Sequence, residues 1–213
     1  MQNIATVQDA GTDQVRHVDS QGDLLAKHGG KGFTVWFTGL PASGKSTLSK
    51  AAHQALLMRG IKTPELLDAD EIRTNISKGL GFSKEDRITN ILRIGWIAQL
   101  LTKHQIPNLV ACIAPYEQAR KQVREMVEVV GGKGSFIEVF VDCPLEACVR
   151  RDPKGLYAKA FAGEIEKLSG LNDTYEAPEH PELRLNTATH NIAEAVECLV
   201  EYLETNHLIE ASK

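Results

Sequence analysis

Two hydrophobic patterns alternate along most of the chain. Short, nearly continuous apolar runs bounded by glycine, proline or polar residues lie at 32–39, within 63–73, at 107–115 and at 134–144. Segments in which apolar residues recur every three or four positions lie at 45–60, 84–105, 116–130 and 191–207. The first pattern is typical of buried strands and the second of amphipathic helices. A further run at 182–187 predicts a strand at the edge of the sheet.

The order of these segments predicts an α/β fold with three layers. Strands alternate with helices, and such connections place helices on both faces of a mainly parallel sheet. Residues 150–180 are polar, charged and rich in glycine, and they follow no clear period. We expect one domain at 31–213, preceded by a polar N-terminal arm at 1–30 that ends in a glycine-rich junction.

The overall composition argues against a large, uniformly charged binding surface. The 213 residues carry a formal net charge of -4, from 24 basic and 28 acidic side chains. We therefore expect neither nucleic acid nor membrane as a partner, and any anion must be bound locally. Neither a basic leader followed by an apolar stretch nor a run of about 18 apolar residues is present, which predicts a soluble, cytoplasmic protein.

The four cysteines suggest no metal site or disulfide. They form no C-x-x-C pair, and each lies in or beside an apolar segment: Cys112, Cys143, Cys148 and Cys198. We expect buried free thiols in a reducing compartment.

A phosphate-binding motif follows the first strand. Residues 39–46 fit G-x-x-x-x-G-K-[ST] in full, between a buried strand and a helix. The glycines permit a loop whose N–H groups converge on phosphates, and the helix adds its positive end. Lys45 supplies a charge for the β and γ phosphates, and the Ser46 hydroxyl is placed to bind Mg²⁺. The motif predicts a P-loop nucleoside triphosphate hydrolase fold that binds ATP through Gly39, Leu40, Pro41, Ala42, Ser43, Gly44, Lys45, Ser46 and Thr47.

Two aspartates end the second predicted strand. Asp68 and Asp70 lie on the same side of an extended segment, at the sheet edge where ligands collect in open α/β sheets. Such carboxylates can hold Mg²⁺ through water or accept a proton from an attacking hydroxyl. Alternatively, Asp70 is only the N-cap of a following helix. The third strand ends without an acidic residue, so this chemistry falls to Asp68 and Asp70.

The segment that follows these aspartates contains four residues that are candidates for binding an acceptor. Arg73 and Arg87 can bind a phosphate or sulfate in a bidentate manner, and Asn90 can contact a base or a sugar. Phe82 is either a stacking platform for a base or ordinary packing. Taken alone, each arginine is more typical of a solvated surface position.

Five segments together resemble the adenylylsulfate kinase family, over about residues 31–188. They read WFTGLPASGKST, LDADEIR, LGFSKEDRITNI, FIEVFVDCPLEACVRRDPKGLYAKA and YEAPEHPEL. The resemblance implies that Arg73, Arg87 and Asn90 grip the phosphosulfate and sugar of the acceptor while Phe82 stacks on its adenine. It further implies a lid that starts at Arg151, which serves the ATP side, and acceptor contacts by Ile113, Lys154, Gly155 and Leu156.

The chain departs from the family pattern at several positions. Ala69 stands where the family has glycine, and Ala114 where some members have a serine that can carry a phosphoryl group, so we expect direct transfer. Leu92 replaces an arginine, and Phe161 belongs to a lid segment that has lost two charges. Leu168 replaces the second aromatic residue that would sandwich the adenine, and Phe161 is a candidate to supply the missing ring.

These observations predict an ATP- and Mg²⁺-dependent adenylylsulfate kinase. Two alternatives stay open: a related kinase for another small anionic nucleotide-like acceptor, and a nucleotide-binding module without activity. The resemblance also implies a homodimer, and a sulfate adenylyltransferase as a partner in the same pathway.

Overall fold

The computed structural model of the chain describes residues 31–211, and the arm at 1–30 lies outside them. In chain order the elements are β1 (Thr34–Thr38), α2 (Lys45–Met58), β2 (Glu65–Asp68), α3 (Ala69–Thr74), α4 (Lys84–Lys103), β3 (Asn108–Ala111), α5 (Glu117–Gly131), β4 (Phe136–Asp142), α6 (Leu145–Arg151), α7 (Leu156–Phe161), β5 (Leu183–Asn186) and α8 (Ile192–Thr205). Every strand and helix that the hydrophobic pattern predicts is present.

The five strands form one parallel sheet in the order β2-β3-β1-β4-β5. All residues of β1 are buried, and Thr34 pairs with Asn108 of β3 on one side and with Phe136 of β4 on the other. β5 lies at an edge. The predictions of a central buried strand, an edge strand at 182–187 and a mainly parallel sheet are confirmed.

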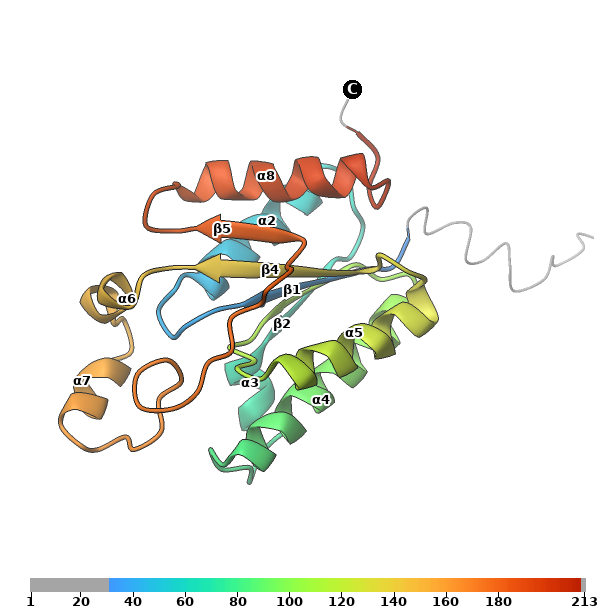
Figure 1. Cartoon of the computed structure of the whole chain (residues 1–213). Coiled ribbons are helices and arrows are strands. Elements are labelled where there is room, and N and C mark those ends of the chain that lie inside the picture. Colours follow the sequence, from blue (N-terminus) through green and yellow to red (C-terminus); the bar gives the residue numbers. More distant parts are fainter. Residues whose placement is uncertain (1–30, 212–213) are drawn as a thin grey trace, which may run out of the picture.

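Helices cover both faces of the sheet (Figure 1), which confirms the three-layer fold. α2 and α8 pack on one face, where Val35 and Phe37 of β1 meet Leu199 in one hydrophobic cluster. α4 and α5 pack on the other face, where Trp36 lies in a second cluster with Val123. Successive side chains of β1 point to opposite faces, so one strand anchors both clusters. Within residues 31–211, the structure contains no helix that is long and apolar enough to cross a membrane.

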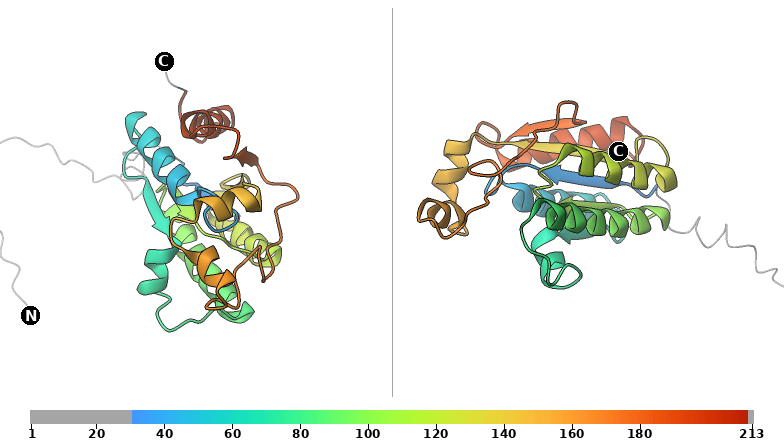
Figure 2. Two further views of the ribbon diagram at one scale, coloured as in Figure 1. Left: turned by 90° about the vertical axis from the view of Figure 1, so that its left-hand side faces the viewer. Right: turned by 60° about the horizontal axis from the view of Figure 1, so that its bottom comes forward.

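Two short helices lie beyond the carboxyl ends of the strands. Seen from that end, α6 and α7 stand in front of the sheet (Figure 2, left). The hydrophobic pattern did not predict them, because α6 has 7 residues and α7 has 6. Segments this short do not show a helical repeat of apolar residues clearly enough to be recognised. We call α6 and α7 the roof, because they cover the end of the sheet at which a ligand would bind.

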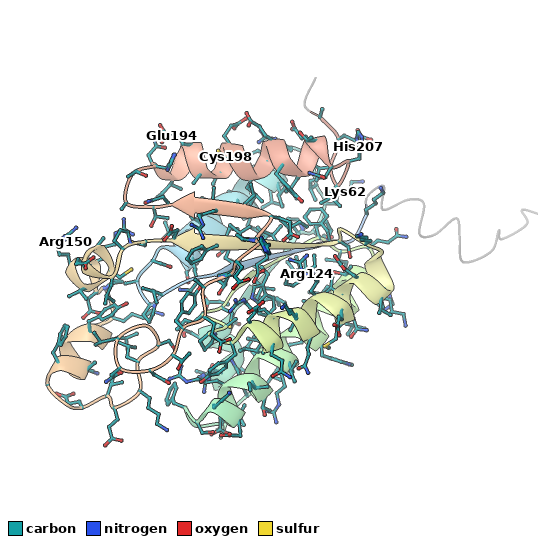
Figure 3. The ribbon with its side chains drawn as sticks, in the orientation of Figure 1. Lys62, Arg124, Arg150, Glu194, Cys198 and His207 are labelled. Atoms are coloured by element: carbon teal, nitrogen blue, oxygen red, sulfur yellow. The ribbon has the colours of Figure 1, made fainter. Side chains whose placement is uncertain are left out.

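One of the cysteine predictions is wrong. Cys112, Cys143 and Cys148 are buried free thiols as expected, whereas Cys198 is exposed on α8 (Figure 3). Cys198 precedes the buried Leu199, and one residue turns a helix by about 100°, which carries the thiol off the buried face.

Candidate active site

A large cavity opens at the carboxyl ends of the strands. Its volume is about 1390 Å³, above the roughly 300–1,000 Å³ of a typical single-ligand pocket. Most predicted site residues line it: Pro41, Ala42, Gly44, Lys45, Ser46, Thr47, Asp68, Asp70, Arg73, Phe82, Arg87, Asn90, Ile113, Arg151, Lys154 and Leu156. Gly39, Leu40, Ser43 and Gly155 belong to the same loops but are not part of the lining. The cavity has room for two ligands of nucleotide size.

The phosphate loop has the geometry that a bound anion needs. Ala42 and Gly44 have φ values of 59° and 106°, which turn the loop sharply before α2. A Cβ at Gly39 would lie 2.6 Å from the Val141 carbonyl oxygen, so the approach of β4 requires glycine there. Gly44 is the N-cap of α2, and no side chain of residues 31–211 caps this helix. The first N–H groups of α2 are therefore left for an anion, and the loop fits the phosphates of ATP.

Lys45 is buried beside this loop. Its Nζ donates hydrogen bonds to the carbonyl oxygens of Gly39 at 3.0 Å and Leu40 at 2.7 Å. Burial disfavours the charged ammonium and lowers the pKa of Lys45 from 10.5 to about 8. A phosphate close to Nζ would restore the charged form, because an opposite charge favours it.

The lowered pKa of Lys45 predicts that ATP affinity falls as the pH rises above about 8. Below that pH the ammonium is charged before and after binding, so this group adds no pH dependence. Above it the free site must take up a proton when ATP binds, and the dissociation constant should rise by up to about tenfold per pH unit. Titration calorimetry in buffers of different ionisation enthalpy measures both quantities. A Lys45→Met variant should bind weakly and lose the proton uptake; uptake that persists in the variant would contradict this origin.

Asp68 and Asp70 have different partners. Asp68 is the N-cap of α3, and its Oδ1 accepts a hydrogen bond from the Asp70 N–H at 2.9 Å. The Asp70 carboxylate forms an ion pair with Lys154, which lies between α6 and α7. The alternative in which Asp70 caps the helix is therefore wrong, because Asp68 is the cap. Asp70 and Lys154 are both exposed, so their contact can open when a ligand enters.

Arg73 and Arg87 flank the ring of Phe82. Their guanidinium carbons lie 4.7 Å and 5.6 Å from the ring centroid, and the ring is 59% exposed. Arg73 also donates to the Gly81 carbonyl oxygen at 2.9 Å, which fixes it beside the loop. An exposed aromatic face next to two cations suits a ligand that carries both a base and an anionic group.

Asn90 has an unused acceptor in the cavity. The side chain is 4% exposed, and its Oδ1 accepts no hydrogen bond within residues 31–211. Buried polar atoms are usually paired with protein or ordered water, so this oxygen is available to a donor group in the cavity. The neighbouring Arg87 is held by the protein, since it donates to Ser169 Oγ at 3.0 Å and to the Lys167 carbonyl oxygen at 2.7 Å.

The roof is tied to the phosphate loop. Arg151 donates to the Thr187 carbonyl oxygen at 2.6 Å and to Thr187 Oγ1 at 3.0 Å, and Thr187 Oγ1 donates to the Ser43 carbonyl oxygen at 2.7 Å. The Tyr157 hydroxyl donates to the Pro41 carbonyl oxygen at 3.0 Å. α6 and α7 thus stand directly over the ATP end of the cavity.

The expectation that Phe161 supplies a second ring is wrong. Phe161 is 65% exposed and is not among the residues that line the cavity, because it ends α7 on its solvent side. Leu168 does line the cavity and packs against Cys148 and Tyr157. Among the residues that line the cavity, Phe82 therefore offers an aromatic surface and Leu168 an aliphatic one.

Sequence reasoning missed two residues of the site. Thr187 joins Arg151 to the phosphate loop. It is the last residue of the predicted strand at 182–187, and its position at the carboxyl end of a parallel strand was the signal that could have identified it. Ser169 is fully buried against Arg87, 82 positions away, and no local pattern signals such a contact.

A metal ion would need the ligand to complete its site. Within the described part of the chain, no group of three or more His, Cys, Asp or Glu side chains could hold a metal. Ser46, Asp68 and Asp70 do line the cavity with oxygen atoms, the ligand type that Mg²⁺ prefers. Mg²⁺ commonly keeps several waters and takes phosphate oxygens as ligands, so these residues fit a nucleotide-bound Mg²⁺.

Comparison with known proteins gives a consistent result. The adenylylsulphate kinase family model matches residues 31–186. An adenylyl-sulfate kinase of Synechococcus sp. (strain JA-2-3B'a(2-13)) is 49% identical over 175 residues, 82% of this chain and 96% of the relative. The APS kinase CysC of Mycobacterium tuberculosis, solved in complex with AMPPNP and APS, is 41% identical with a TM-score of 0.78, over 82% of this chain and 99% of that one. A hexameric APS kinase from Thiobacillus denitrificans is 36% identical with a TM-score of 0.65, over 87% of this chain and 31% of that one.

Proposed function

The chain belongs to the adenylylsulfate kinase family, and we propose that it transfers the γ-phosphoryl group of ATP to the 3′-hydroxyl of adenosine 5′-phosphosulfate. The products are ADP and 3′-phosphoadenylylsulfate. The observation that carries the proposal is one cavity with a phosphate loop at one end, the Arg73 and Phe82 cluster at the other, and Asp70 in its lining. Adenosine 5′-phosphosulfate offers the base and the two anionic groups that such a cluster suits.

At the ATP end, the chain supplies positive charge in fixed positions. The Lys45 ammonium and the uncapped N-terminus of α2 would hold the β and γ phosphates. Ser46, with Asp68 through water, would hold Mg²⁺, which neutralises charge on the transferred group when it is bound. Because these groups are placed before the reaction, they stabilise the transition state without reorganising.

At the acceptor end, Asp70 is the residue proposed to orient and deprotonate the 3′-hydroxyl. Asp68 is already engaged as a helix cap, whereas the exposed Asp70 carboxylate pairs with the exposed ammonium of Lys154. Lys154 would move from Asp70 to an anionic group of the acceptor as it enters. Ala114 carries no hydroxyl, so no phosphoserine forms there and transfer is direct and in line.

The activity test is ADP release from Mg-ATP with and without adenosine 5′-phosphosulfate. Release should depend on this acceptor and saturate with it, and AMP should be a much weaker acceptor because it lacks the sulfate and the contacts that the sulfate would make. Equal turnover with other nucleotides would instead support a kinase with a different acceptor. ATP binding without any turnover would support a nucleotide-binding module.

We also propose the domain boundaries, the assembly, the cellular location and the pathway partner of the protein. Residues 31–213 form the kinase domain and 1–30 an accessory arm, the protein acts as a homodimer in the cytoplasm, and a sulfate adenylyltransferase supplies its acceptor. The hexameric relative supports self-association in general. Light scattering of the purified full chain measures the assembly directly.

A further inference from the structure

Shortly after β3, three consecutive residues each have a carbonyl oxygen that accepts a hydrogen bond from a different part of the fold. Thr38 Oγ1 of β1 donates to the Ile113 carbonyl oxygen at 2.6 Å. Arg120 Nη1 of α5 donates to the Ala114 carbonyl oxygen at 2.7 Å. The Glu176 N–H, from the connection between α7 and β5, donates to the Pro115 carbonyl oxygen at 2.8 Å. We call residues 113–115 the exit turn; all three line the cavity.

The exit turn needs such support because its backbone is strained. Ala114 has a φ of 43°, a conformation that residues with a side chain rarely adopt, and it is buried. Strain of this kind persists only when the surroundings fix the conformation, and it gathers at functional sites. The Arg120 guanidinium that holds Ala114 is itself fixed by a buried ion pair with Glu138 at 2.7 Å. The position of Ile113 in the acceptor pocket therefore depends on these contacts.

Glu176 secures the same turn a second time. Its Oε2 accepts a hydrogen bond from the Glu117 N–H at 2.7 Å, at the start of α5. The N-cap of α5, Tyr116, provides no side-chain cap of its own, so Glu176 supplies one from 59 positions away. Glu176 therefore binds both the last carbonyl of the exit turn and the first turn of the helix that follows it.

Tyr175 adds a contact below the turn. Its hydroxyl lies 3.1 Å from Thr38 Oγ1, and Thr38 uses its single proton on Ile113, so Tyr175 is the donor. Burial raises the pKa of Tyr175 to about 12, which keeps that proton in place at neutral pH. The pair Tyr175 and Glu176 thus joins the connection from α7 to β1, β3 and α5 at once.

The same connection reaches the opposite wall of the acceptor pocket. Asp173 lies 3.4 Å from Arg87, and its carbonyl oxygen accepts from the Gly170 N–H at 2.8 Å. Leu168 and Ser169, which line the cavity, belong to this short loop. Farther on, Glu182 accepts two hydrogen bonds from Arg124 at 2.7 Å. Figure 3 shows Arg124 between α5 and the sheet. Figure 1 shows the orange connection passing the start of α5 before it reaches β5.

We propose that Tyr175 and Glu176 are positioning residues for the acceptor: they lock the exit turn and the loop at 168–173 together, so that both walls of the acceptor pocket are in place before binding. The inference rests on the proposed function, since it assigns these residues to the adenylylsulfate half of the site. The ATP half is held by hydrogen bonds of Arg151, Thr187 and Tyr157 in which neither Tyr175 nor Glu176 takes part. Loss of the lock should therefore affect one substrate and spare the other.

The test is Glu176→Ala, because Glu176 is exposed and its loss leaves the core intact. The KM for adenylylsulfate should rise about fivefold, the ratio that corresponds to about 1 kcal/mol for a lost helix cap. The KM for ATP should stay within about twofold of the original value, and the melting temperature should fall by no more than about 4 °C. Glu176→Gln keeps an acceptor for the Glu117 N–H and should recover most of the affinity. Glu179→Ala is the matched control, since Glu179 is exposed in the same segment and forms no hydrogen bond among residues 31–211.

Three results would overturn the proposal. Equal rises in both KM values, a loss of active protein with unchanged KM values, or no change at all would each show that Glu176 does not position the acceptor pocket. Tyr175→Phe provides a second variant and should raise the same KM by a smaller factor. If the unaltered protein does not turn over adenylylsulfate at all, the proposed function fails; calorimetric binding of adenylylsulfate to the same variants then still tests the lock.

Discussion

Replacing Lys45 with methionine is expected to lower turnover by about a thousandfold, because the variant loses the positive charge that faces the transferred phosphoryl group. Stability should not fall much. Burial opposes the charged form of Lys45, as its pKa of about 8 indicates, and methionine fills a similar volume without a charge. Removing the buried charge therefore favours the folded state, but the two carbonyl oxygens that accept hydrogen bonds from Nζ lose their partner, which offsets part of this stabilisation. Steady-state ADP release and thermal unfolding measure the two effects.

The matched control is Lys50→Met on the same helix. Lys50 is exposed, so the control removes the same charge from α2 without touching the cavity, and it should leave turnover unchanged. A Lys45→Met protein that keeps more than about a tenth of the original turnover would contradict the assignment of the phosphate loop.

The second large effect is expected for Asp70→Asn. The variant keeps the shape of the side chain but loses the ability to accept a proton, and turnover should fall by about 10²–10⁴. The fold should be unaffected, because the Asp70 side chain is exposed and its ion pair with Lys154 contributes little to stability. Turnover at saturating concentrations of both substrates isolates the chemical step from binding.

Asp68→Asn separates the two aspartates. Asparagine caps helices as well as aspartate does, so α3 should remain capped. The variant should raise the Mg²⁺ concentration needed for half-maximal activity and lower turnover less than Asp70→Asn does. The reverse order, with Asp68→Asn the more damaging change, would transfer the role of base to Asp68.

Much of this fold could be predicted because its signals are local. The apolar run around Val35 marks a strand buried on both faces, and the glycines at 39 and 44 mark a turn between that strand and a helix. Each signal lies within a few residues of the element it predicts. Asp68 and Asp70 were likewise placed at the correct sheet edge, since all parallel strands end on the same side.

The remaining features depend on contacts between distant residues. Whether Asp68 or Asp70 caps α3 is decided by the backbone around them, and either choice fits the same spacing. The outward position of Phe161 follows from the orientation of a helix of 6 residues, too short to show a period. The contacts of Glu176 with Pro115 and Glu117 join segments far apart in the chain, and no local pattern contains them.

The most direct test of the central claim is to identify the product formed from Mg-ATP and adenosine 5′-phosphosulfate. ³¹P NMR of the reaction, with mass spectrometry of the purified product, locates the new phosphoryl group. The account predicts one phosphate added at the 3′-oxygen, with the sulfate retained and one ADP formed for each product molecule. A phosphoryl group at another position, or free phosphate released from ATP while the acceptor stays unchanged, would contradict it.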